Sequence, residues 1–389
     1  MSKRADIPES KVIPFSAPSL GEDEVRAVAE ALRSGAVGGD GPLGKALALR
    51  MGERFGIRHV LLTPSATHAL ELALQVADIG PDDEVVLPSF TFVSVANAVL
   101  RRGARPVFAE ISDATLDLDP DRLEEVVTPR TRAVIPAHYG GVGAPMERYQ
   151  EIAGRQGIRV IEDAAQGLGA RRGGRWLGGF GDMAGFSFHE TKNLTCGEGG
   201  AFLTQRDDLF KRAEVIYEKG TNRSQFFRGE VDKYTWIGPG GSYVLSDILA
   251  ALLGVQLDRM EALHAARRRV FERYQAGLSD LAREGKLQLP VIPDVCEPNW
   301  HVFYVRLPSG EERDRVLAEM RRRGIMCTFH FVPLHSSPFG SAQLGYREGD
   351  LPVTEAVSRT LLRLPLHAGL TDEDVSRVIE AMGEVVRGR

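Results

Sequence analysis

The sequence predicts an α/β fold, in which helices cover both faces of a mixed, mainly parallel sheet and a smaller α+β domain follows. Two observations support this prediction. Short apolar runs rich in β-branched residues alternate with amphipathic helical patterns along the first part of the chain. Near Ser246 the pattern changes, and a long helical stretch rich in Ala, Leu and Arg begins. No internal repeat interrupts this order.

Four apolar runs are the candidate strands of the large sheet. A strand that is buried on both faces shows a continuous apolar run, as the strands of parallel sheets do. Between the runs, residues 66–76 predict a helix, because their apolar positions fall on one helical face. The runs are Val85–Leu87, Ala133–Ile135, Val160–Ile161 and Phe186–Phe188.

The C-terminal part is predicted to form a smaller domain. A long helix is expected from Asp247 through Leu263 and on to about Tyr274. A strand at 301–305, a basic helix at 312–323 and a final helix at 372–386 follow it. We therefore predict a large domain over residues 1–245 and a small domain over residues 246–389.

Composition excludes several classes of protein. Of the 389 residues, 43% are hydrophobic and 26% are charged, which is typical of globular proteins. A formal net charge of -5 argues against a general nucleic-acid binder or membrane-surface binder. The polar start of the chain and the lack of a long apolar stretch argue against a secretory signal and a membrane span.

The cysteines indicate a reduced, cytoplasmic protein. Three thiols without close spacing form neither a disulfide framework nor a zinc pattern. They are Cys196, Cys296 and Cys327. His330 and His335 are five positions apart, which is not the spacing of a zinc-binding pair, so no metal is expected.

Lys192 follows a candidate strand and precedes a cluster of glycines that ends at Gly200. A lysine at the edge of a sheet, among small and apolar residues, can lose part of its hydration and become a nucleophilic amine. The glycines would let the backbone pass close to a bulky ligand. Taken alone, the segment is explained better by a solvated loop lysine.

Two further segments suggest a ligand site. The acidic pair Glu162-Asp163 directly follows the strand at Val160–Ile161, and ligands bind at this end of the strands in open α/β sheets. Small hydroxyl residues at 63–67 open the helix at 66–76, and the free amides of a helix start can bind a phosphate. Each segment alone is also explained by helix capping. Their combination with Lys192, 29 positions after Asp163, is what a pyridoxal-phosphate (PLP) enzyme requires.

The chain resembles the DegT-type sugar-nucleotide aminotransferases over nearly its full length. The motifs that carry this resemblance are Glu162-Asp-Ala-Ala-Gln166 and Ser187-Phe-His189, followed by Lys192 and Gly197-Glu-Gly-Gly200. The resemblance implies the PLP-dependent transferase fold of the aspartate aminotransferase type. Within the family the chain is most similar to the TDP-4-oxo-6-deoxyglucose 4-aminotransferases. The segments that support this narrower match are 63–70, 88–93 and 188–193, and the run 218–229 with 231–236 indicates the same.

The resemblance implies a role for each motif residue toward PLP. Lys192 is expected to hold the cofactor covalently and to act as the acid and base of the reaction. Asp163 is expected to pair with the pyridine nitrogen and make the ring an electron sink. Gln166 is expected near the phenolic oxygen of the ring, and Phe92 to stack on the ring face.

The phosphate of the cofactor is expected at the hydroxyl of Ser187 and the amides of Ala66 and Thr67. Many relatives add an asparagine that reaches this phosphate from the partner subunit. This chain has Ser242 at that place, so the contact across the dimer is either lost or replaced by a shorter serine contact.

The substrate side is expected to include His189 and His330, although a histidine that only packs would look the same. The loop 219–236 mixes cationic and aromatic side chains, as a diphosphate and a base would require. A charged surface loop is the alternative explanation. The candidate substrate residues of this loop are Arg223, Phe226, Arg228 and Lys233.

The predicted activity is the transfer of the amino group of L-glutamate to C4 of a TDP-linked 4-oxo-6-deoxy sugar by a homodimer with shared active sites. Such amino sugars serve polysaccharide or antibiotic synthesis. A C3 transaminase is one alternative. A dehydratase that uses pyridoxamine phosphate (PMP) is another, but those relatives carry histidine in place of Lys192. A PLP-binding regulatory protein is the non-enzymatic alternative.

Overall fold

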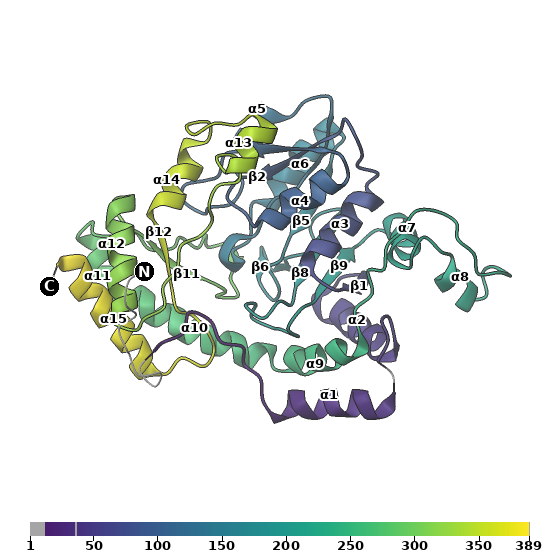
Figure 1. Ribbon diagram of the computed structural model, residues 1–389, viewed down its shortest axis with the longest axis horizontal. Helices are drawn as coiled ribbons and strands as arrows, with labels where there is room; N and C mark the ends of the chain where they lie inside the picture. Colours follow the sequence, from purple (N-terminus) through teal and green to yellow (C-terminus); the bar gives the residue numbers. More distant parts are fainter. Residues whose placement is uncertain (1–11, 36, 389) are drawn as a thin grey trace.

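The computed structural model describes residues 12–35 and 37–388. Within these residues the largest sheet has seven strands in the order β1-β9-β8-β5-β4-β2-β3 (Figure 1). In that order the strands are β1 (His59–Thr63), β9 (Gly200–Thr204), β8 (Met183–Ser187), β5 (Arg159–Asp163), β4 (Thr131–Val134), β2 (Glu84–Pro88) and β3 (Arg105–Ala109). All run parallel except β9, which pairs antiparallel with both of its neighbours.

The register of this sheet brings three strand ends to one edge. Gly200 at the start of β9 pairs with Thr63 at the end of β1 and with Ser187 at the end of β8. Asp163, the last residue of β5, pairs with Gly185 in β8. The residues that follow β1, β5 and β8 therefore meet at the carboxyl edge of the sheet, where open α/β sheets bind their ligands.

Helices cover both faces of the sheet. Neighbouring residues of a strand point to opposite sides, and here the side chains on both sides are apolar and need to be covered. Val85 and Leu87 of β2 face one layer, whereas Val86 faces the other. The first layer is α3 (Ala66–Val76), α4 (Val93–Arg101) and α7 (Asp207–Tyr217). The second is α2 (Pro42–Phe55), α5 (Pro120–Val126), α6 (Met146–Gln156) and α9 (Asp247–Asp258).

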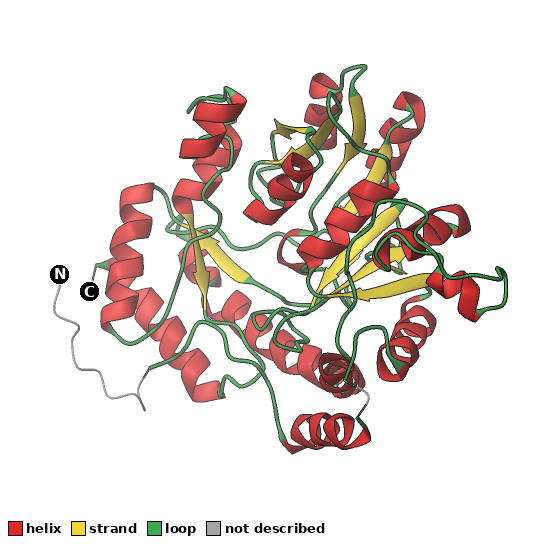
Figure 2. Cartoon of the chain, turned by 45° about the vertical axis from the view of Figure 1, so that its right-hand side comes forward, coloured by secondary structure: helices red, strands yellow, loops and turns green. Residues whose placement is uncertain are grey.

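A second sheet of two antiparallel strands forms the core of the C-terminal part (Figure 2). Its strands are β11 (Phe303–Arg306) and β12 (Leu361–Leu364). The helices of this part are α10 (Met260–Gly277), α11 (Ser279–Arg283), α12 (Gly310–Arg322), α13 (Pro338–Leu344), α14 (Pro352–Thr360) and α15 (Asp372–Arg387).

The remaining elements lie at the periphery. Helix α1 (Glu22–Ser34) lies along α9, and the buried carboxylate of Glu24 accepts hydrogen bonds from Gln256 and Arg259 at 2.6 and 2.5 Å. Helix α8 (Arg223–Phe227) projects from the right-hand end in Figure 1. A small three-stranded sheet comprises β6 (Arg171–Arg172), β7 (Arg175–Trp176) and β10 (Cys296–Glu297), and a short 3-10 helix spans Tyr139–Gly141.

The long helix that the sequence predicts after Ser246 is divided at Arg259 into α9 and α10. Leu253 and Leu257 of α9 pack with the large sheet, whereas Val270 and Tyr274 of α10 pack with β11 and β12. The helix pair therefore belongs to both cores. We propose a domain boundary within α10, some twenty residues beyond the predicted one.

The expected elements on either side of this helix pair are found with small shifts. The helix predicted at 66–76 is α3 with the same bounds, and the strand predicted at 301–305 begins at Phe303. Over residues 12–35 and 37–388, no helix combines the length and the apolar character that a membrane span needs.

Candidate active site

A cavity of about 580 Å³ opens at the carboxyl edge of the large sheet, against the C-terminal domain. One wall comes from the start of α3, from the loop before α4 and from the ends of β5 and β8. The other wall comes from α10, β12 and the segments around 301 and 330. The cavity brings together nine of the predicted site residues: Ala66, Thr67, Phe92, Asp163, Gln166, Ser187, His189, Lys192 and His330.

Lys192 lies in the loop between β8 and β9, where its amide donates to the carbonyl of His189 at 2.9 Å. Burial lowers the pKa of its amine to about 8, while the nearby carboxylate of Asp163 partly opposes this and the charge of Arg363 adds to it. A lysine with a lowered pKa is partly neutral near neutral pH. The amine can therefore act as a nucleophile and as a base.

Asp163 ends β5 with its side chain only 8% exposed. Its Oδ1 accepts a hydrogen bond from the amide of Ala165 at 3.1 Å, and its own amide donates to Pro136 at 2.9 Å. Burial raises the pKa of this carboxyl, whereas the charge of Lys192 lowers it. A buried carboxylate of this kind needs a cationic partner to stay ionised.

The other acid of the pair, Glu162, is fully buried and points away from the cavity into a hydrogen-bond network. It accepts the amides of Gly178, Phe180 and Gly181 at 2.8, 2.7 and 2.7 Å and lies 2.9 Å from His138 Nε2. The amide of Ala144 donates to His138 Nδ1 at 3.1 Å, so the ring hydrogen of the neutral tautomer is on Nε2. This network fixes the end of β5 that carries Asp163.

The start of α3 presents unpaired amides to the cavity. Ser65 caps the helix by accepting the amide of His68 at 3.2 Å, and the first internal bond joins the amide of Ala69 to the carbonyl of Ser65. The amides of Ala66 and Thr67 precede that bond and remain available for an anion.

Gly200 lets β9 lie directly against the start of α3. A Cβ at this position would be 2.3 Å from the carbonyl carbon of Ser65 and 2.5 Å from the nitrogen of Ala66. Ser187, which pairs with Gly200, therefore lies beside the helix start and adds a hydroxyl to its amides.

Gln166, Tyr139 and His330 continue the wall. The Oε1 of Gln166 accepts the amide of Gly140 at 2.7 Å, which leaves the Nε2 group of Gln166 to donate elsewhere. The hydroxyl of Tyr139 lies 3.0 Å from His330 Nδ1. Burial and the charge of Arg363 lower the pKa of His330 well below its usual value, so this histidine is a neutral hydrogen-bonding group.

Sequence comparison identifies the family of this chain. The sequence model of the DegT/DnrJ/EryC1/StrS aminotransferase family matches residues 18–383. The chain belongs to this family. Among curated relatives, the spore coat polysaccharide biosynthesis protein SpsC of Bacillus subtilis (strain 168) is 34% identical over 383 residues, which are 97% of either chain.

Solved structures of similar proteins have the same fold. TlmJ, an aminotransferase from Streptoalloteichus hindustanus, is 32% identical with a TM-score of 0.88, over 97% of this chain and 99% of its own. Spr1654 from Streptococcus pneumoniae, solved in a PLP form, is 28% identical with a TM-score of 0.89 over the same shares. The PLP-dependent aminotransferase fold and the DegT family expected from the sequence are both confirmed.

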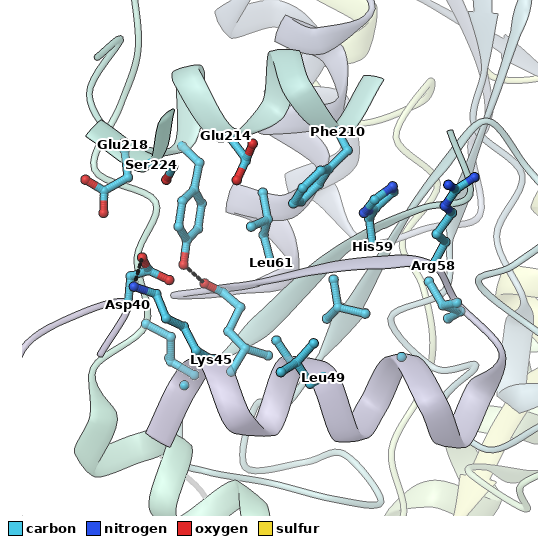
Figure 3. A pocket seen from close by; sticks show the side chains of 18 of the residues that line it. Asp40, Lys45, Leu49, Arg58, His59, Leu61, Phe210, Glu214, Glu218 and Ser224 are labelled. Carbon is cyan, nitrogen blue, oxygen red and sulfur yellow. Dashed lines mark hydrogen bonds and ion pairs between the residues drawn. The ribbon is translucent and has the colours of Figure 1, made fainter. Parts of the chain in front are cut away.

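The predicted substrate residues of the loop 219–236 lie outside this cavity. Arg223 and Arg228 line a separate cavity of about 880 Å³ between α2, β1 and α7. Figure 3 shows Asp40 and Lys45 at one end of that cavity and Arg58 and His59 at the other. Phe226, Lys233 and Ser242 are exposed and line neither cavity.

Ion pairs hold Arg223 and Arg228 against α7 and the residue that follows it. Arg223 lies 3.1 Å from Glu218, and Arg228 lies 2.6 Å from Glu214. Within one chain, the DegT-family site therefore forms without the loop that was expected to bind substrate.

The sequence did not reveal three polar residues of the cavity: His301, Arg267 and Arg363. His301 Nδ1 lies 2.8 Å from Asn193 Oδ1, and Asn193 Nδ2 donates to the carbonyl of Asn299 at 2.7 Å. This chain of bonds ties the residue next to Lys192 to the C-terminal domain. Arg363 interrupts the apolar run 361–366, and that interruption is the one sign of it in the sequence.

Proposed function

We propose that this chain moves the amino group of L-glutamate to C4 of a TDP-linked 4-oxo-6-deoxyhexose, with PLP as the cofactor. The observation that supports this most directly is that the Lys192 amine and the buried Asp163 carboxyl line one cavity of a DegT-family fold. An amine with a pKa near 8 and an acid that needs a cationic partner are the two groups that PLP chemistry uses.

The residues of the cavity fit PLP. The amides of Ala66 and Thr67 with the hydroxyl of Ser187 would hold the phosphate. Asp163 would pair with the protonated ring nitrogen, and the Nε2 group of Gln166 would donate to the phenolic oxygen. Phe92, which is 60% exposed at the mouth of the cavity, has a free ring face on which the cofactor would stack.

PLP supplies an electron sink that stabilises negative charge on the carbon next to the nitrogen. Lys192 Nζ would take the proton from this carbon of the donor. In the half-reaction with the keto-sugar it would deliver a proton to C4. Asp163 would keep the ring nitrogen charged, because the amide of Ala165 holds its carboxylate in place. His330 and His189 line the same cavity and would hold hydroxyl groups of the sugar.

The choice of C4 and of TDP is supported by the run 218–236, which resembles that of the 4-aminotransferases. Because Arg223 and Arg228 lie away from the Lys192 cavity of their own chain, they would serve a substrate in a partner's site. A homodimer that exchanges this loop would bring the two cations to the diphosphate of the nucleotide. Ser242 lies in the same region and would face the phosphate of the partner's cofactor.

The function is tested by incubating the purified protein with PLP, L-glutamate and TDP-4-oxo-6-deoxyglucose. The expected product, identified by NMR, carries one new amine at C4. The Lys192→Ala variant should give no product while it keeps the thermal unfolding temperature of the wild type to within a few degrees. An amine at C3, loss of a hydroxyl without amination, or unchanged turnover in Lys192→Ala would each refute the proposal.

A further inference from the structure

The side chain of Asn193, the residue that follows Lys192, is bonded on both sides to the C-terminal domain. Its Nδ2 donates to the carbonyl of Asn299 at 2.7 Å, and its Oδ1 lies 2.8 Å from His301 Nδ1. The segment 188–199, which carries the lysine, forms neither helix nor strand. Side-chain bonds such as these therefore help to fix the course of the backbone at the reacting amine.

The two bonds of Asn193 determine which nitrogen of His301 carries the ring hydrogen. A carbonyl oxygen only accepts, so Asn193 must turn its NH2 group toward Asn299 and its oxygen toward His301. The Nδ1 of His301 is therefore a donor. Burial, with the charges of Lys192 and Arg267, lowers the pKa of this ring well below its usual value, so the ring is neutral. Its Nε2 then carries the lone pair, on a ring that lines the Lys192 cavity.

The backbone that carries this ring has an unusual conformation. Trp300, the residue before it, has a φ of 53°, in the left-handed region that residues other than glycine rarely occupy. Such a conformation persists only where the surroundings fix it. Arg267 of α10, which is 6% exposed, donates to the carbonyls of Trp300 and His301 at 3.1 and 2.8 Å. The direction of the His301 ring toward Asn193 therefore depends on Arg267.

The same segment also contacts the loop that follows Asp163. The Nδ2 of Asn299 donates to the carbonyls of Gln166 and Leu168 at 2.7 and 2.9 Å. Three consecutive residues, 299–301, thus contact the loops after β5 and β8. These loops carry the acid and the lysine of the site.

We propose that His301 is a positioning residue for the Lys192 amine and that it acts through the bond from its Nδ1 to Asn193. This inference rests on the proposed role of Lys192. It adds that the C-terminal domain aligns the amine with the aldehyde of the cofactor and with the proton of the donor. The rival role for His301 is direct contact with a substrate through Nε2, and the two roles use different atoms.

Two substitutions separate the two ring nitrogens. The amide nitrogen of Asn is as many bonds from Cα as the Nδ1 of His, and that of Gln is as many bonds away as the Nε2. His301→Asn therefore keeps the donor to Asn193, whereas His301→Gln keeps only a group at the position of Nε2. Arg322→Gln on α12, where the side chain is 71% exposed, is the control for a surface substitution.

The first readout uses the apoenzyme, because covalent uptake of PLP requires attack by the Lys192 amine. Loss of one buried hydrogen bond corresponds to a factor of about ten. The rate constant of uptake, followed by stopped-flow absorbance, should fall about tenfold in His301→Gln and stay within about threefold of wild type in His301→Asn. A substitution that only unfolds part of the protein lowers the amount of PLP bound and leaves this rate constant unchanged.

The second readout is the half-reaction of the loaded enzyme with L-glutamate in a single turnover. His301→Gln should lower the saturating rate about tenfold and leave the half-saturating glutamate concentration within about twofold of wild type. Direct binding of the donor through Nε2 would instead raise that concentration in His301→Asn and spare His301→Gln, and this result would overturn the inference.

Asn193→Ala tests the route of the effect. If His301 acts through Asn193, the double variant with His301→Gln should take up PLP within about twofold of the rate of Asn193→Ala alone, whereas independent effects would multiply to about 100-fold. Asn193→Ala also replaces His301→Gln if that variant does not fold. It should slow uptake about tenfold by itself, and a wild-type rate would contradict the proposed route.

The outcomes separate this inference from the proposed function. If the wild-type apoenzyme takes up no PLP, or the loaded enzyme reacts with no amino donor, the proposed function fails and the inference fails with it. If the wild type reacts but His301→Gln keeps both wild-type rates, the inference alone fails. Equal slowing by His301→Asn and His301→Gln would also overturn it, because the Nδ1 donor would then make no difference.

Discussion

At the scale of single residues, opposing environments prepare the two central groups of the site. Burial drives the Lys192 amine toward its neutral form and the Asp163 carboxyl toward its protonated form, while each charge favours the ionised state of the other. A bound ring cation would remove this balance by pairing with Asp163. The empty site and the loaded site therefore titrate differently.

The first prediction concerns this titration. Only the neutral amine attacks an aldehyde, so the rate at which apoenzyme takes up PLP should rise with pH and level off above a midpoint near 8. Because the Asp163 carboxylate raises the pKa of Lys192, Asp163→Asn should move that midpoint to lower pH. Stopped-flow absorbance between pH 6 and pH 10 measures both profiles. A midpoint that stays in place or rises in the variant would contradict the assigned interaction.

The second prediction is that Asp163→Asn lowers kcat about 100-fold or more. The amide cannot neutralise a ring cation, and breaking a buried charge pair costs about 3–5 kcal/mol. Steady-state kinetics at saturating PLP measure the loss. Glu125→Gln, which removes an exposed carboxylate on α5 that does not line the cavity, is the control and should change kcat less than about threefold. A variant with more than half of the wild-type kcat would exclude Asp163 from the reaction.

The sequence predicted Lys192 and Asp163 but not Arg363, Arg267 or His301, and there is a physical reason. The first two belong to compact motifs in which the strand, the acid and the lysine are close along the chain. The other three become part of the site only when the C-terminal domain packs against the sheet edge, more than a hundred residues away from Asp163. No local pattern records such a contact.

At the scale of elements, the helix bounds that were predicted best are those set by local chemistry. Helix α3 begins where the Ser65 hydroxyl caps it, and its buried residues continue from Ala69 to Val76. The break between α9 and α10 was not predictable, because no Gly or Pro marks it. Arg259 at the break donates to Glu24 of α1 at 2.5 Å and to the carbonyl of Ser19 at 3.3 Å. The break between α9 and α10 therefore coincides with contacts to residues far away in the sequence, which no local pattern shows.

The third prediction concerns the contact between β9 and α3. Gly200→Ala would place a methyl group within 2.5 Å of the Ala66 nitrogen and would push the helix start away from Ser187. Overpacking of this kind costs about 1–3 kcal/mol, and the phosphate site should open with it. We expect a lower unfolding temperature and PLP binding weaker by about tenfold, measured by fluorescence titration.

Gly154→Ala on α6 is the matched control, because a Cβ there meets no atom within 4 Å. It should stabilise the protein by about 0.5–1 kcal/mol and leave PLP binding unchanged. If Gly200→Ala bound PLP as tightly as wild type, the close contact would have no role in the phosphate site.

At the scale of the whole molecule, the chain leaves large apolar side chains uncovered around the loop 219–236. Trp236 is 76% exposed, and Phe227 and Leu49 are each 70% exposed. Side chains of this size are rarely left in water without a partner, so this face fits an interface between copies. Figure 1 shows α8 projecting from the end of the molecule opposite β11 and β12, as a segment that reaches into a second subunit would.

The last prediction tests whether the active sites are shared. Lys192→Ala and the double variant Arg223→Ala, Arg228→Ala should each be nearly inactive as separate dimers. A mixed dimer holds one complete site, because the intact lysine of one subunit meets the intact loop of the other. After random exchange of subunits, about half of the dimers are mixed and each has one site of two, so about a quarter of the wild-type activity should return.

The negative control is a mixture of the Lys192→Ala variant with a double variant that carries both Lys192→Ala and Arg322→Gln. No subunit in this mixture has Lys192, so no activity should return. If the loop serves its own chain, a mixed dimer gains no complete site and activity stays at the level of the separate variants.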